Sequence, residues 1–291
     1  MRERTDLPIP KAFVAGWPVA HSLSPPMHRH WLAAHGIDGA YEAVPVAPGE
    51  FGSFVRSLSP ETWRGGNVTI PHKEAALAAA AWCDDEAHAI GAANTLWFEA
   101  GRLHAANTDA YGFAANLDDH KPSWANVDSA VVLGAGGAAR AVVHAVRKRG
   151  IARVTIVNRT PERAEELVSN FGKGAVALGW DGLPGALAEA GLLVNTTSLG
   201  MQGQPSLEID LTAARRDLLV TDAVYVPLVT PLLRTAQAAG LGIVDGLGML
   251  MHQGVPGFEK WFGVRPKVTP QLRALLVGEL QRREKPDKAH V

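Results

Sequence analysis

The sequence predicts an α/β fold of two domains, each built around a largely parallel sheet. Short apolar runs rich in valine and isoleucine alternate with helical patterns along the chain, as in α/β proteins. One of these runs leads into a glycine-rich turn at 129–139, of the kind that binds dinucleotides. The 291 residues, 47% hydrophobic and 20% charged, suffice for two buried cores.

Composition narrows the possible partners and the compartment. A net charge of -1 provides no broad field for nucleic acid or an anionic membrane surface, so we expect neither partner. The single cysteine, Cys83, cannot form an intrachain disulfide, and we expect it to fill a core or a helix. Residues 1–11 lack the apolar segment of a signal peptide, and no stretch approaches the roughly 20 apolar residues of a membrane span. We therefore expect a cytoplasmic protein.

The first block of the chain reads as strands and helices around a mixed sheet. Ser24 is expected to cap a helix over 24–36 that Gly36 ends. The segment 67–70 alternates polar with apolar residues, as a half-buried strand does, until Pro71 ends the pattern. Further strands are expected at 11–17, 39–46 and 94–100, with a turn at 100–102 leading back into 103–109, and an alanine-rich helical stretch at 73–93, interrupted near Asp84.

The second block has the pattern of a doubly wound nucleotide domain. A helix at 109–120 and a linker at 121–128 precede two strand-to-helix units, at 129–150 and 152–172. More strands are expected at 192–198, 218–225 and 240–246. Two terminal helices, at 247–263 and 269–285, are expected to pack back on the first block, with a frayed tail at 286–291.

The turn after the strand at 129–133 has the spacing G-x-G-x-x-A. Gly134 permits the tight turn, Gly136 admits a pyrophosphate close to the backbone, and Ala139 allows close helix packing. A plain strand-to-helix turn is the alternative, but the context favours a dinucleotide site. The residues expected at the phosphates are Gly134, Ala135, Gly136, Gly137 and Ala138.

The end of the next strand indicates which dinucleotide binds. NAD-binding domains carry an acidic residue there, whereas this chain has Asn158, Arg159, Thr160 and Arg163. Two guanidinium groups would bind a 2'-phosphate, so the sequence predicts NADP. The alternative is a solvated helix start in which Arg163 pairs with Glu166.

The chain resembles the shikimate dehydrogenase family. Eight segments occur in the family's order: "GWPVAHSLSPPMH", "NVTIPHKEAA", "GAANTL", "NTDAYGF", "LGAGGAARA", "NRTPERAEEL", "DAVYVPLVTPLL" and "DGLGMLMHQG". The resemblance implies reversible, NADP-linked oxidation of shikimate to 3-dehydroshikimate, serving aromatic amino-acid biosynthesis. It also implies a substrate domain from both chain ends, 1–110 and 248–291, and a Rossmann-type NADP-binding domain at 111–247. Family members are monomers or homodimers.

The resemblance assigns the proton transfer to Lys73, with Asp109 as its partner carboxylate. Oxidation of an alcohol needs a base for the hydroxyl proton, and a free lysine, with a pKa near ~10.4, is a poor base. Burial would have to lower its pKa, while the Asp109 charge opposes that change and fits orientation of the substrate. The alternative for Lys73 is a solvated cation on the first turn of a helix, where the helix dipole disfavours it.

The remaining site residues also follow from the resemblance. Ser22 and Ser24 are assigned to the substrate carboxylate, with Tyr225 near that end, although Ser24 would also suit a helix cap. Thr69, Asn94, Asp109 and Gln253 are assigned to the ring hydroxyls. At the nicotinamide end, Val224 and Gly246 follow the last strands, Asp85 matches a position often acidic in the family, and 196–198 form a rim or cap a turn.

Two positions depart from the family pattern, and the histidines suggest no metal. Arg29 stands where an amide is usual, and Ala105 where a glycine is common, which affects pocket geometry rather than chemistry. His21, His28, His30, His72 and His252 lack the spacing of metal ligands and are expected to pack or to orient neighbouring groups. We therefore predict no metal site.

Three other functions remain open at this stage. A quinate/shikimate dehydrogenase would often use NAD and carry threonine for the second serine of "SLS", whereas this chain has Ser24 and the two arginines. An aminoshikimate dehydrogenase is the second alternative. The third is a non-catalytic NADP-binding sensor, against which the presence of Lys73 and Asp109 argues.

Overall fold

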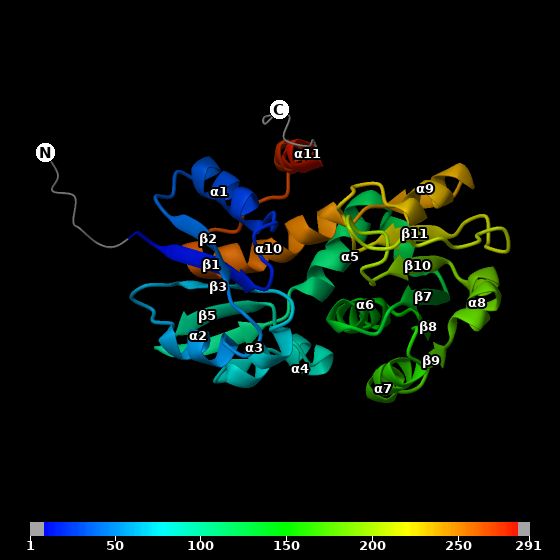
Figure 1. Ribbon diagram of the computed structural model, residues 1–291, viewed down its shortest axis with the longest axis horizontal. Helices are drawn as coiled ribbons and strands as arrows, with labels where there is room; N and C mark the ends of the chain where they lie inside the picture. Colours follow the sequence, from blue (N-terminus) through cyan, green and yellow to red (C-terminus); the bar gives the residue numbers. More distant parts are fainter. Residues whose placement is uncertain (1–8, 285–291) are drawn as a thin grey trace, which may run out of the picture. The chain divides into compact units, whose positions relative to one another are not determined.

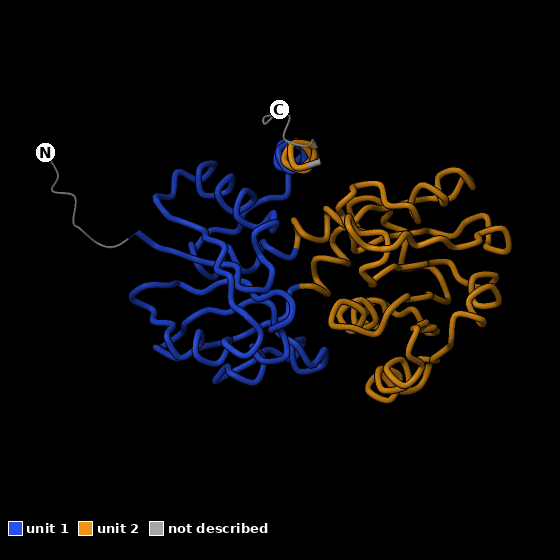
Figure 2. Tube along the Cα trace, in the orientation of Figure 1, with its two compact units in different colours: residues 1–108, 253–276 blue, residues 109–252, 277–291 orange. Residues whose placement is uncertain are grey.

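The computed structural model describes residues 9–284, so the segments 1–11 and 286–291 discussed above lie wholly or largely outside the described residues. The chain forms two compact units, shown in blue and orange in Figure 2. Unit 1 comprises Met1–Thr108 and Gln253–Leu276, and unit 2 comprises Asp109–His252 and Val277–Val291. The predicted domains, 1–110 with 248–291 and 111–247, assign the C-terminal residues differently, and their functional roles remain a prediction.

Unit 1 contains a mixed six-stranded sheet in the order β2-β1-β3-β5-β6-β4 (Figure 1). The strand β1 pairs in parallel with β2 and β3, whereas β5 runs antiparallel to β3 and β6. Gly101 and Ala100, both with positive φ, form the expected turn between β5 and β6. The strands are β1 (Lys11–Gly16), β2 (Ala40–Pro45), β3 (Gly65–Val68), β4 (Trp82–Cys83), β5 (Thr95–Glu99) and β6 (Arg102–Ala106).

Helices and part of the C-terminal region complete unit 1. The indole Nε1–H of Trp31 donates to the Lys267 carbonyl at 3.1 Å, and that of Trp261 donates to the Leu96 carbonyl at 2.7 Å. Residues 253–276 therefore pack on the first block, as predicted, whereas the start of the first terminal helix and the end of the second belong to unit 2. The helices are α1 (Ser24–Ala34), α2 (Phe51–Ser57), α3 (Lys73–Ala79) and α4 (Asp85–Ile90), while α10 (Leu247–Phe262) and α11 (Pro270–Glu284) contribute to both units.

Two local predictions in unit 1 are wrong. Ser24 does not cap α1: the helix begins at Ser24, Leu23 occupies the N-cap position, and no side chain caps it. Since Pro25 and Pro26 have no N–H to donate, the first amide after Ser24 is that of Met27, which bonds to the Leu23 carbonyl at 3.1 Å. Gly36, with φ +63°, follows the helix end, as expected.

The strand expected at 67–70 begins and ends earlier. The strand β3 covers Gly65–Val68, and all four residues are buried rather than alternating, because β3 lies inside the sheet and is covered on both faces. Thr69 and Ile70 follow the strand, and Ile70 is 66% exposed.

The alanine-rich stretch is interrupted near Asp84, as predicted, but a strand occupies the interruption. Trp82 and Cys83 form β4, which pairs with β6, and the Asp84 side chain then caps α4 by accepting from the Ala87 N–H at 2.8 Å. Cys83 is therefore a core residue in a strand, and burial raises the pKa of its thiol. Ala105 is buried in β6 opposite both Leu96 and Cys83, whereas Arg29 is exposed on α1.

Unit 2 contains an all-parallel six-stranded sheet in the order β12-β11-β10-β7-β8-β9, which is a doubly wound order and confirms the predicted fold class. β7 lies at the centre, with the chain winding first toward β9 and then toward β12. The strand β9 was not predicted, because its four residues, only one of them buried, give too short an apolar run. The strands are β7 (Ser129–Leu133), β8 (Arg153–Val157), β9 (Ala175–Leu178), β10 (Leu192–Asn195), β11 (Leu219–Asp222) and β12 (Gly242–Val244).

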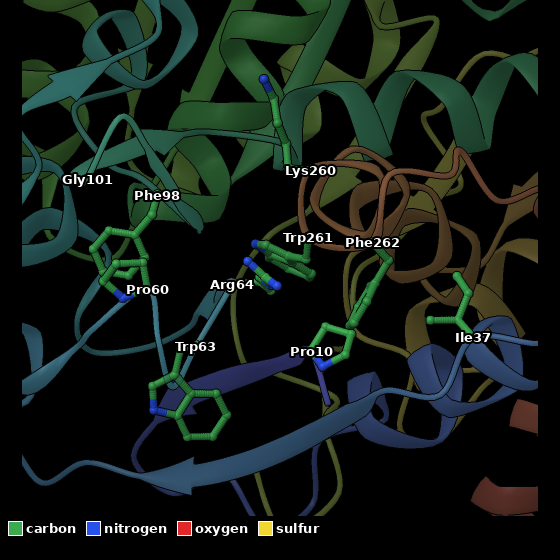
Figure 3. Close-up of a pocket in the computed structure, with 10 residues that line it drawn as sticks. All are labelled: Pro10, Ile37, Pro60, Trp63, Arg64, Phe98, Gly101, Lys260, Trp261 and Phe262. Carbon is green, nitrogen blue, oxygen red and sulfur yellow. The ribbon is translucent and has the colours of Figure 1, made fainter. Parts of the chain in front are cut away.

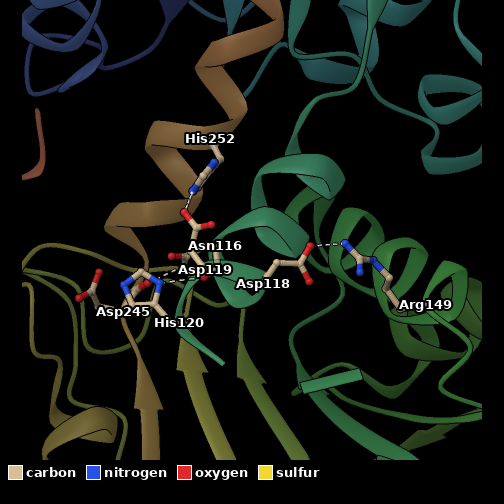
Figure 4. A network of polar contacts seen from close by, with 7 residues as sticks. All are labelled: Asn116, Asp118, Asp119, His120, Arg149, Asp245 and His252. Atoms are coloured by element: carbon tan, nitrogen blue, oxygen red, sulfur yellow. Dashed lines mark hydrogen bonds and ion pairs between the residues drawn. The ribbon is translucent and has the colours of Figure 1, made fainter. Parts of the chain in front are cut away.

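Within unit 2, polar contacts join α5 to the first part of α10 and to the segment before it (Figure 4). Asn116 on α5 donates to the Asp245 carbonyl at 2.8 Å, and Asp119 pairs with His252 on α10 at 2.9 Å. Asp118 forms an ion pair with Arg149, which follows α6. The helices are α5 (Asp109–His120), α6 (Gly137–Lys148), α7 (Pro161–Phe171), α8 (Leu183–Glu189) and α9 (Pro231–Ala238), with short 3-10 turns at Pro122–Asn126 and Trp180–Gly182.

Candidate functional site

The predicted substrate residues of unit 1 follow strand ends at one edge of its sheet. Register pairs Ala15 with Val68, Asn67 with Thr95, and Thr95 with Ala106. The ends of β1, β3 and β6 and the beginning of β5 therefore lie at the same edge. Thr69 directly follows β3 and Asn94 directly precedes β5, while Lys73 begins the helix after β3, and Ser22 and Ser24 lie beyond β1.

Lys73 is the first residue of α3 and is half-buried. Its carbonyl accepts the Ala93 N–H at 2.9 Å, which brings the start of α3 next to Asn94. The Thr69 carbonyl accepts the His72 N–H at 3.0 Å, so the turn before Lys73 is closed by its own backbone. Local backbone bonds thus fix Thr69, Lys73 and Asn94 relative to one another.

Asn94 and Gln253 meet in the interior of unit 1. The Asn94 side chain, 2% exposed, donates to the Gln253 side-chain oxygen at 3.2 Å. Its own oxygen accepts from the Thr108 N–H at 2.9 Å and from the Thr95 hydroxyl at 3.0 Å. The Thr108 hydroxyl also lies 2.8 Å from the Gln253 carbonyl. Two predicted residues 159 positions apart are therefore held by shared hydrogen bonds.

Two residues that were not predicted as site residues extend this arrangement. The Tyr41 hydroxyl donates to the Asn67 side-chain oxygen at 2.6 Å, and burial raises the pKa of Tyr41 well above its usual value. Asn67 donates to the Asn94 carbonyl at 3.2 Å and to the Thr95 hydroxyl at 3.3 Å. Neither Tyr41 in β2 nor Asn67 in β3 gave a separate sequence signal of a site. We call Tyr41, Asn67, Asn94, Thr95, Thr108 and Gln253 the polar cluster of unit 1.

His28 packs beside this cluster as a neutral ring. It stacks on Tyr41 with ring centroids 3.9 Å apart, and burial lowers its pKa to about 3 although Asn67 opposes the shift. A Cβ at Gly254 would lie 2.5 Å from the end of the Met27 side chain and 3.3 Å from the His28 Nε2, so glycine at this position of α10 allows the close approach of α1. The packing role expected for His28 is confirmed.

Ser22 and Ser24 lie on the loop between β1 and α1. The Ser22 hydroxyl accepts the Ser24 N–H at 3.2 Å, so the two residues are adjacent in space. Ser24 is 4% exposed and Ser22 is half-buried. The assignment of both serines to a carboxylate remains a prediction.

The glycine turn of unit 2 has the form that a diphosphate requires. Gly134 has φ +105°, and a Cβ there would lie 2.8 Å from the Thr196 hydroxyl, so only glycine fits. At Gly136 and Gly137, by contrast, a Cβ would meet nothing within 4 Å, which leaves open space beside the backbone. The helix α6 begins at Gly137 without a side-chain cap, so its first N–H groups are available to an anion. The turn therefore fits a dinucleotide.

The segment after β8 presents two cations. Arg159 and Arg163 are both exposed, and Asn158 holds the turn by donating to the Thr160 carbonyl at 2.8 Å. Glu166 forms its ion pair with Arg140 at 3.1 Å, so the alternative pairing with Arg163 is not observed. The two guanidinium groups fit recognition of a 2'-phosphate.

Two of the other predicted cofactor residues, Val224 and Gly246, follow the carboxyl ends of β11 and β12, whereas Asp85 lies in unit 1. Val224 is 8% exposed, and a Cβ at Gly246 would lie 2.6 Å from the Asp222 carbonyl, so packing alone requires that glycine. Burial raises the pKa of Tyr225, although Arg283 opposes the shift. Asp85, in contrast, is exposed at the start of α4 in unit 1. Its contact with a cofactor remains a prediction.

Lys73 and Asp109 belong to different units. Asp109 is the first residue of α5 and is 6% exposed, and it follows Thr108 of the polar cluster directly in the chain. Within unit 1, a separate pocket of about 430 Å³ is lined by Trp63, Arg64, Trp261 and seven other residues, none of them predicted site residues (Figure 3). The joint action of Lys73 and Asp109 remains a prediction.

Two further features are absent from residues 9–284, a metal-ligand cluster and a membrane-spanning helix. No group of three or more His, Cys, Asp or Glu side chains in this range could hold a metal ion. None of the helices in the same range is long and apolar enough to cross a membrane.

Comparison with known proteins decides the family. Three family models match in chain order: the shikimate dehydrogenase substrate binding domain at 14–96, shikimate / quinate 5-dehydrogenase at 119–204, and the shikimate 5'-dehydrogenase C-terminal domain at 246–276. The shikimate dehydrogenase (NADP(+)) of Mesorhizobium japonicum is 59% identical over 270 residues, covering 93% of this chain and 96% of that protein. The chain belongs to the shikimate dehydrogenase family.

Solved structures of this family share the fold of the whole chain. Shikimate 5-dehydrogenase from Thermus thermophilus, in complex with NADP(H) and shikimate, has a TM-score of 0.81 and 38% identity, covering 94% of this chain and 99% of that one. Quinate dehydrogenase from Corynebacterium glutamicum, in complex with NAD, has a TM-score of 0.84 and 28% identity, covering 93% and 99%. These two structures therefore contain different cofactors, NADP(H) in one and NAD in the other.

Proposed function

We propose that this chain is an NADP-dependent shikimate dehydrogenase, which interconverts shikimate and 3-dehydroshikimate in aromatic amino-acid biosynthesis. The observation that carries the proposal is the arrangement of the predicted substrate residues at the edge of the unit 1 sheet. There Thr69, Lys73 and Asn94 are fixed by backbone bonds, and Asn94 is hydrogen-bonded to Gln253. The 59% identity to a protein of that name supports the same conclusion.

The proposed chemistry uses Lys73 as the acid and base. When shikimate is oxidised, the Lys73 amine takes the proton of the ring hydroxyl as the hydride leaves the same carbon, and in reduction the ammonium returns it. NADP, when bound, supplies the hydride acceptor and NADPH the donor. The Asp109 carboxylate accepts a hydrogen bond from a ring hydroxyl and orients it toward Lys73. The starting position of Lys73 on α3 supports this role, because a cation there is unfavourable for the helix itself.

The remaining roles follow the chemistry of shikimate. Thr69, Asn94 and Gln253 bind ring hydroxyls, since their neutral groups can both donate and accept hydrogen bonds. Ser22 and Ser24 bind the carboxylate, with Tyr225 near the same end. Because Asn94 and Gln253 are already held by the polar cluster, substrate binding would not have to order them.

The proposed cofactor residues divide between phosphates, adenosine and nicotinamide. The turn Gly134, Ala135, Gly136, Gly137 and Ala138 holds the diphosphate at the start of α6. Asn158, Arg159, Thr160 and Arg163 bind the adenosine ribose and its 2'-phosphate. Asp85, Val224 and Gly246 lie at the nicotinamide end.

A spectrophotometric assay tests the proposal directly. The purified full chain is mixed with shikimate or quinate and with NADP or NAD, and NADPH or NADH formation is followed by absorbance. We expect turnover with shikimate and NADP to exceed the other three combinations. Faster turnover with quinate and NAD would favour the activity of the Corynebacterium glutamicum structure instead, and aminoshikimate is a third substrate for the same assay. Binding of NADP without any turnover would indicate a sensor.

We further propose a cytoplasmic enzyme whose partners are small molecules, not nucleic acids or membranes, in keeping with the net charge of -1. A homodimer is the assembly proposed from the resemblance, and light scattering distinguishes it from a monomer.

A further inference from the structure

Asp222, the last residue of β11, is buried among neutral donors within unit 2. It is 1% exposed. One carboxylate oxygen accepts the Val224 N–H at 3.0 Å and the Asn195 side-chain amide at 2.9 Å, and the other accepts the Thr230 hydroxyl at 2.7 Å. None of the three donors is a cation. Burial raises the pKa of this carboxyl to about 6 despite those hydrogen bonds.

Through these bonds a single side chain fixes three segments at the carboxyl edge of the sheet. Asn195 ends β10, and its side chain in turn accepts from the Thr197 N–H at 3.0 Å and donates to the Leu199 carbonyl at 3.2 Å. Thr230 caps α9 by accepting the Leu233 N–H at 3.3 Å. The carboxylate therefore joins the loop after β10, the loop after β11 and the start of α9.

Asp222 is one of the anchors of the loop after β11, together with the Ala223 N–H, which donates to the Asn195 carbonyl at 2.9 Å. The loop runs from Ala223 to Val229, and besides these bonds it is tied to the neighbouring loop by the Gln202 N–H, which donates to the Val226 carbonyl at 2.8 Å. Val224 is the residue in this loop to which the proposed function gives a role at the nicotinamide. Its main-chain N–H is the group that Asp222 holds.

A purely structural role would be filled at lower cost by a neutral residue. A buried carboxylate without a cationic partner is expensive, whereas an asparagine oxygen could accept the same two N–H groups. Residue 222 is nevertheless an aspartate. Its carboxylate is a stronger hydrogen-bond acceptor than an asparagine oxygen, so it restricts the Val224 main chain more tightly.

We propose that Asp222 is a positioning residue for the nicotinamide end of the cofactor: through its bond to the Val224 N–H and through Asn195 it sets the backbone of the loops after β10 and β11. The inference rests on the proposed function, because it assumes that NADP binds at this edge. Asp222 itself does not touch the cofactor in this proposal.

The test compares two ligands that share one end. NADP⁺ spans the whole site, whereas 2',5'-ADP has the adenosine and 2'-phosphate but no nicotinamide. Calorimetry would measure both dissociation constants for the full wild-type chain, D222A, D222N and T230V. For D222A we expect NADP⁺ to bind about 10-fold or more weakly and 2',5'-ADP to bind within about twofold of wild type, since a lost charged hydrogen bond is of this size. D222N, which retains an oxygen for Val224, should restore NADP⁺ affinity to within about threefold of wild type.

Asp210, an exposed acid of the same unit, provides the matched control, and D210A should bind both ligands like wild type. Equal loss of both ligands in D222A, or unchanged NADP⁺ binding, would overturn the inference. If D222A does not fold, T230V, which removes one of the three hydrogen bonds to the carboxylate, decides in its place: it should weaken NADP⁺ by about threefold and spare 2',5'-ADP. A wild-type chain that neither binds NADP⁺ nor oxidises shikimate would instead count against the proposed function, so the two failures are distinguishable.

Discussion

The two sheet edges carry their polar groups in opposite ways. In unit 1 the groups are side chains, buried and hydrogen-bonded to one another in the polar cluster. In unit 2 they are mainly backbone N–H groups at an open glycine turn, together with the exposed Arg159 and Arg163. The first arrangement suits a small rigid ligand with several hydroxyls, because its geometry is set in advance. The second suits a long polyanion, which is bound by charge and main-chain donors along its length.

The same comparison shows where each edge is sensitive to substitution. In unit 1 a changed side chain of the polar cluster breaks several shared hydrogen bonds, so stability and binding should fall together, whereas Lys73 lies outside this cluster. In unit 2 the exposed arginines can be removed without any loss in the core, so binding should fall alone. The predictions below test this difference, beginning with the largest effect.

Lys73 provides the strongest test of the unit 1 edge. We expect Lys73→Ala to lower kcat by about 10²-fold or more, the scale of a lost acid and base, while the KM for shikimate changes much less. Stability should not fall, because a cation in the first turn of α3 opposes the helix dipole. Steady-state kinetics and thermal unfolding measure both, with the exposed Lys121→Ala as the control. Unchanged kcat would remove Lys73 from its role.

Arg159 and Arg163 test the open edge of unit 2. Replacing both with alanine should raise the KM for NADP by about 10²-fold, from the loss of two charge-assisted contacts, and leave the weaker NAD reaction nearly unchanged. The melting temperature should stay the same, since both side chains are exposed. Arg153→Ala, which removes only an exposed ion pair with Glu189, should leave both cofactors unaffected. Equal damage to NADP and NAD would show that the phosphate site lies elsewhere.

A substitution at Thr108 tests whether the polar cluster contributes both to stability and to substrate binding. Thr108→Val removes the hydroxyl that lies 2.8 Å from the Gln253 carbonyl and 3.1 Å from the Asn94 oxygen. The free energy of unfolding of unit 1 should fall by about 1–2 kcal/mol, and the KM for shikimate should rise. Denaturant unfolding and kinetics provide the measurements, and the exposed Thr62→Val is the matched control. A loss of stability with no change in KM would show that the cluster does not support the substrate residues.

Protonation of Asp222 should make the stability of unit 2 depend on pH, and this effect is smaller than the others. Its folded-state pKa of about 6 exceeds the usual 3.8, so between these values the native state binds more protons than the unfolded state. Stability from this group is therefore present at low pH and is lost as the pH rises through about 6. Between pH 8 and pH 5 the wild type should gain about 1 kcal/mol relative to Asp222→Asn, which has no proton to bind. Thermal unfolding at both pH values checks this, and an identical pH response in the two proteins would contradict it.

The parts of the fold that the sequence predicted well are those with local signals. The glycine turn at 134–137 and the helix after it follow from residue type and spacing, and the parallel order of unit 2 follows from the repeated pattern. Ser24 was misjudged because capping depends on which N–H groups are free, and two prolines had removed them. Strands β4 and β9 were missed because they are short and carry little apolar periodicity.

The site was predictable where family motifs mark it and not where distant residues meet. Asn94 and Gln253 were identified by resemblance, but their hydrogen bond across 159 positions depends on how the sheet and α10 fold together. Tyr41 and Asn67 gave no separate signal, because a buried tyrosine and a strand asparagine occur in many cores. Asp222 was not predicted for the same reason. Its importance depends on three hydrogen-bond partners that are either distant along the chain or of common residue types.

The close packing at Gly254 limits how this enzyme could be redesigned. A side chain at this position would displace the end of the Met27 side chain and crowd His28, so a change in the helix turn that carries Gln253 also disturbs its packing against α1. Libraries intended to broaden substrate range should therefore leave this turn unchanged and vary the loop residues around Ser22, where half-exposed positions can accept new shapes.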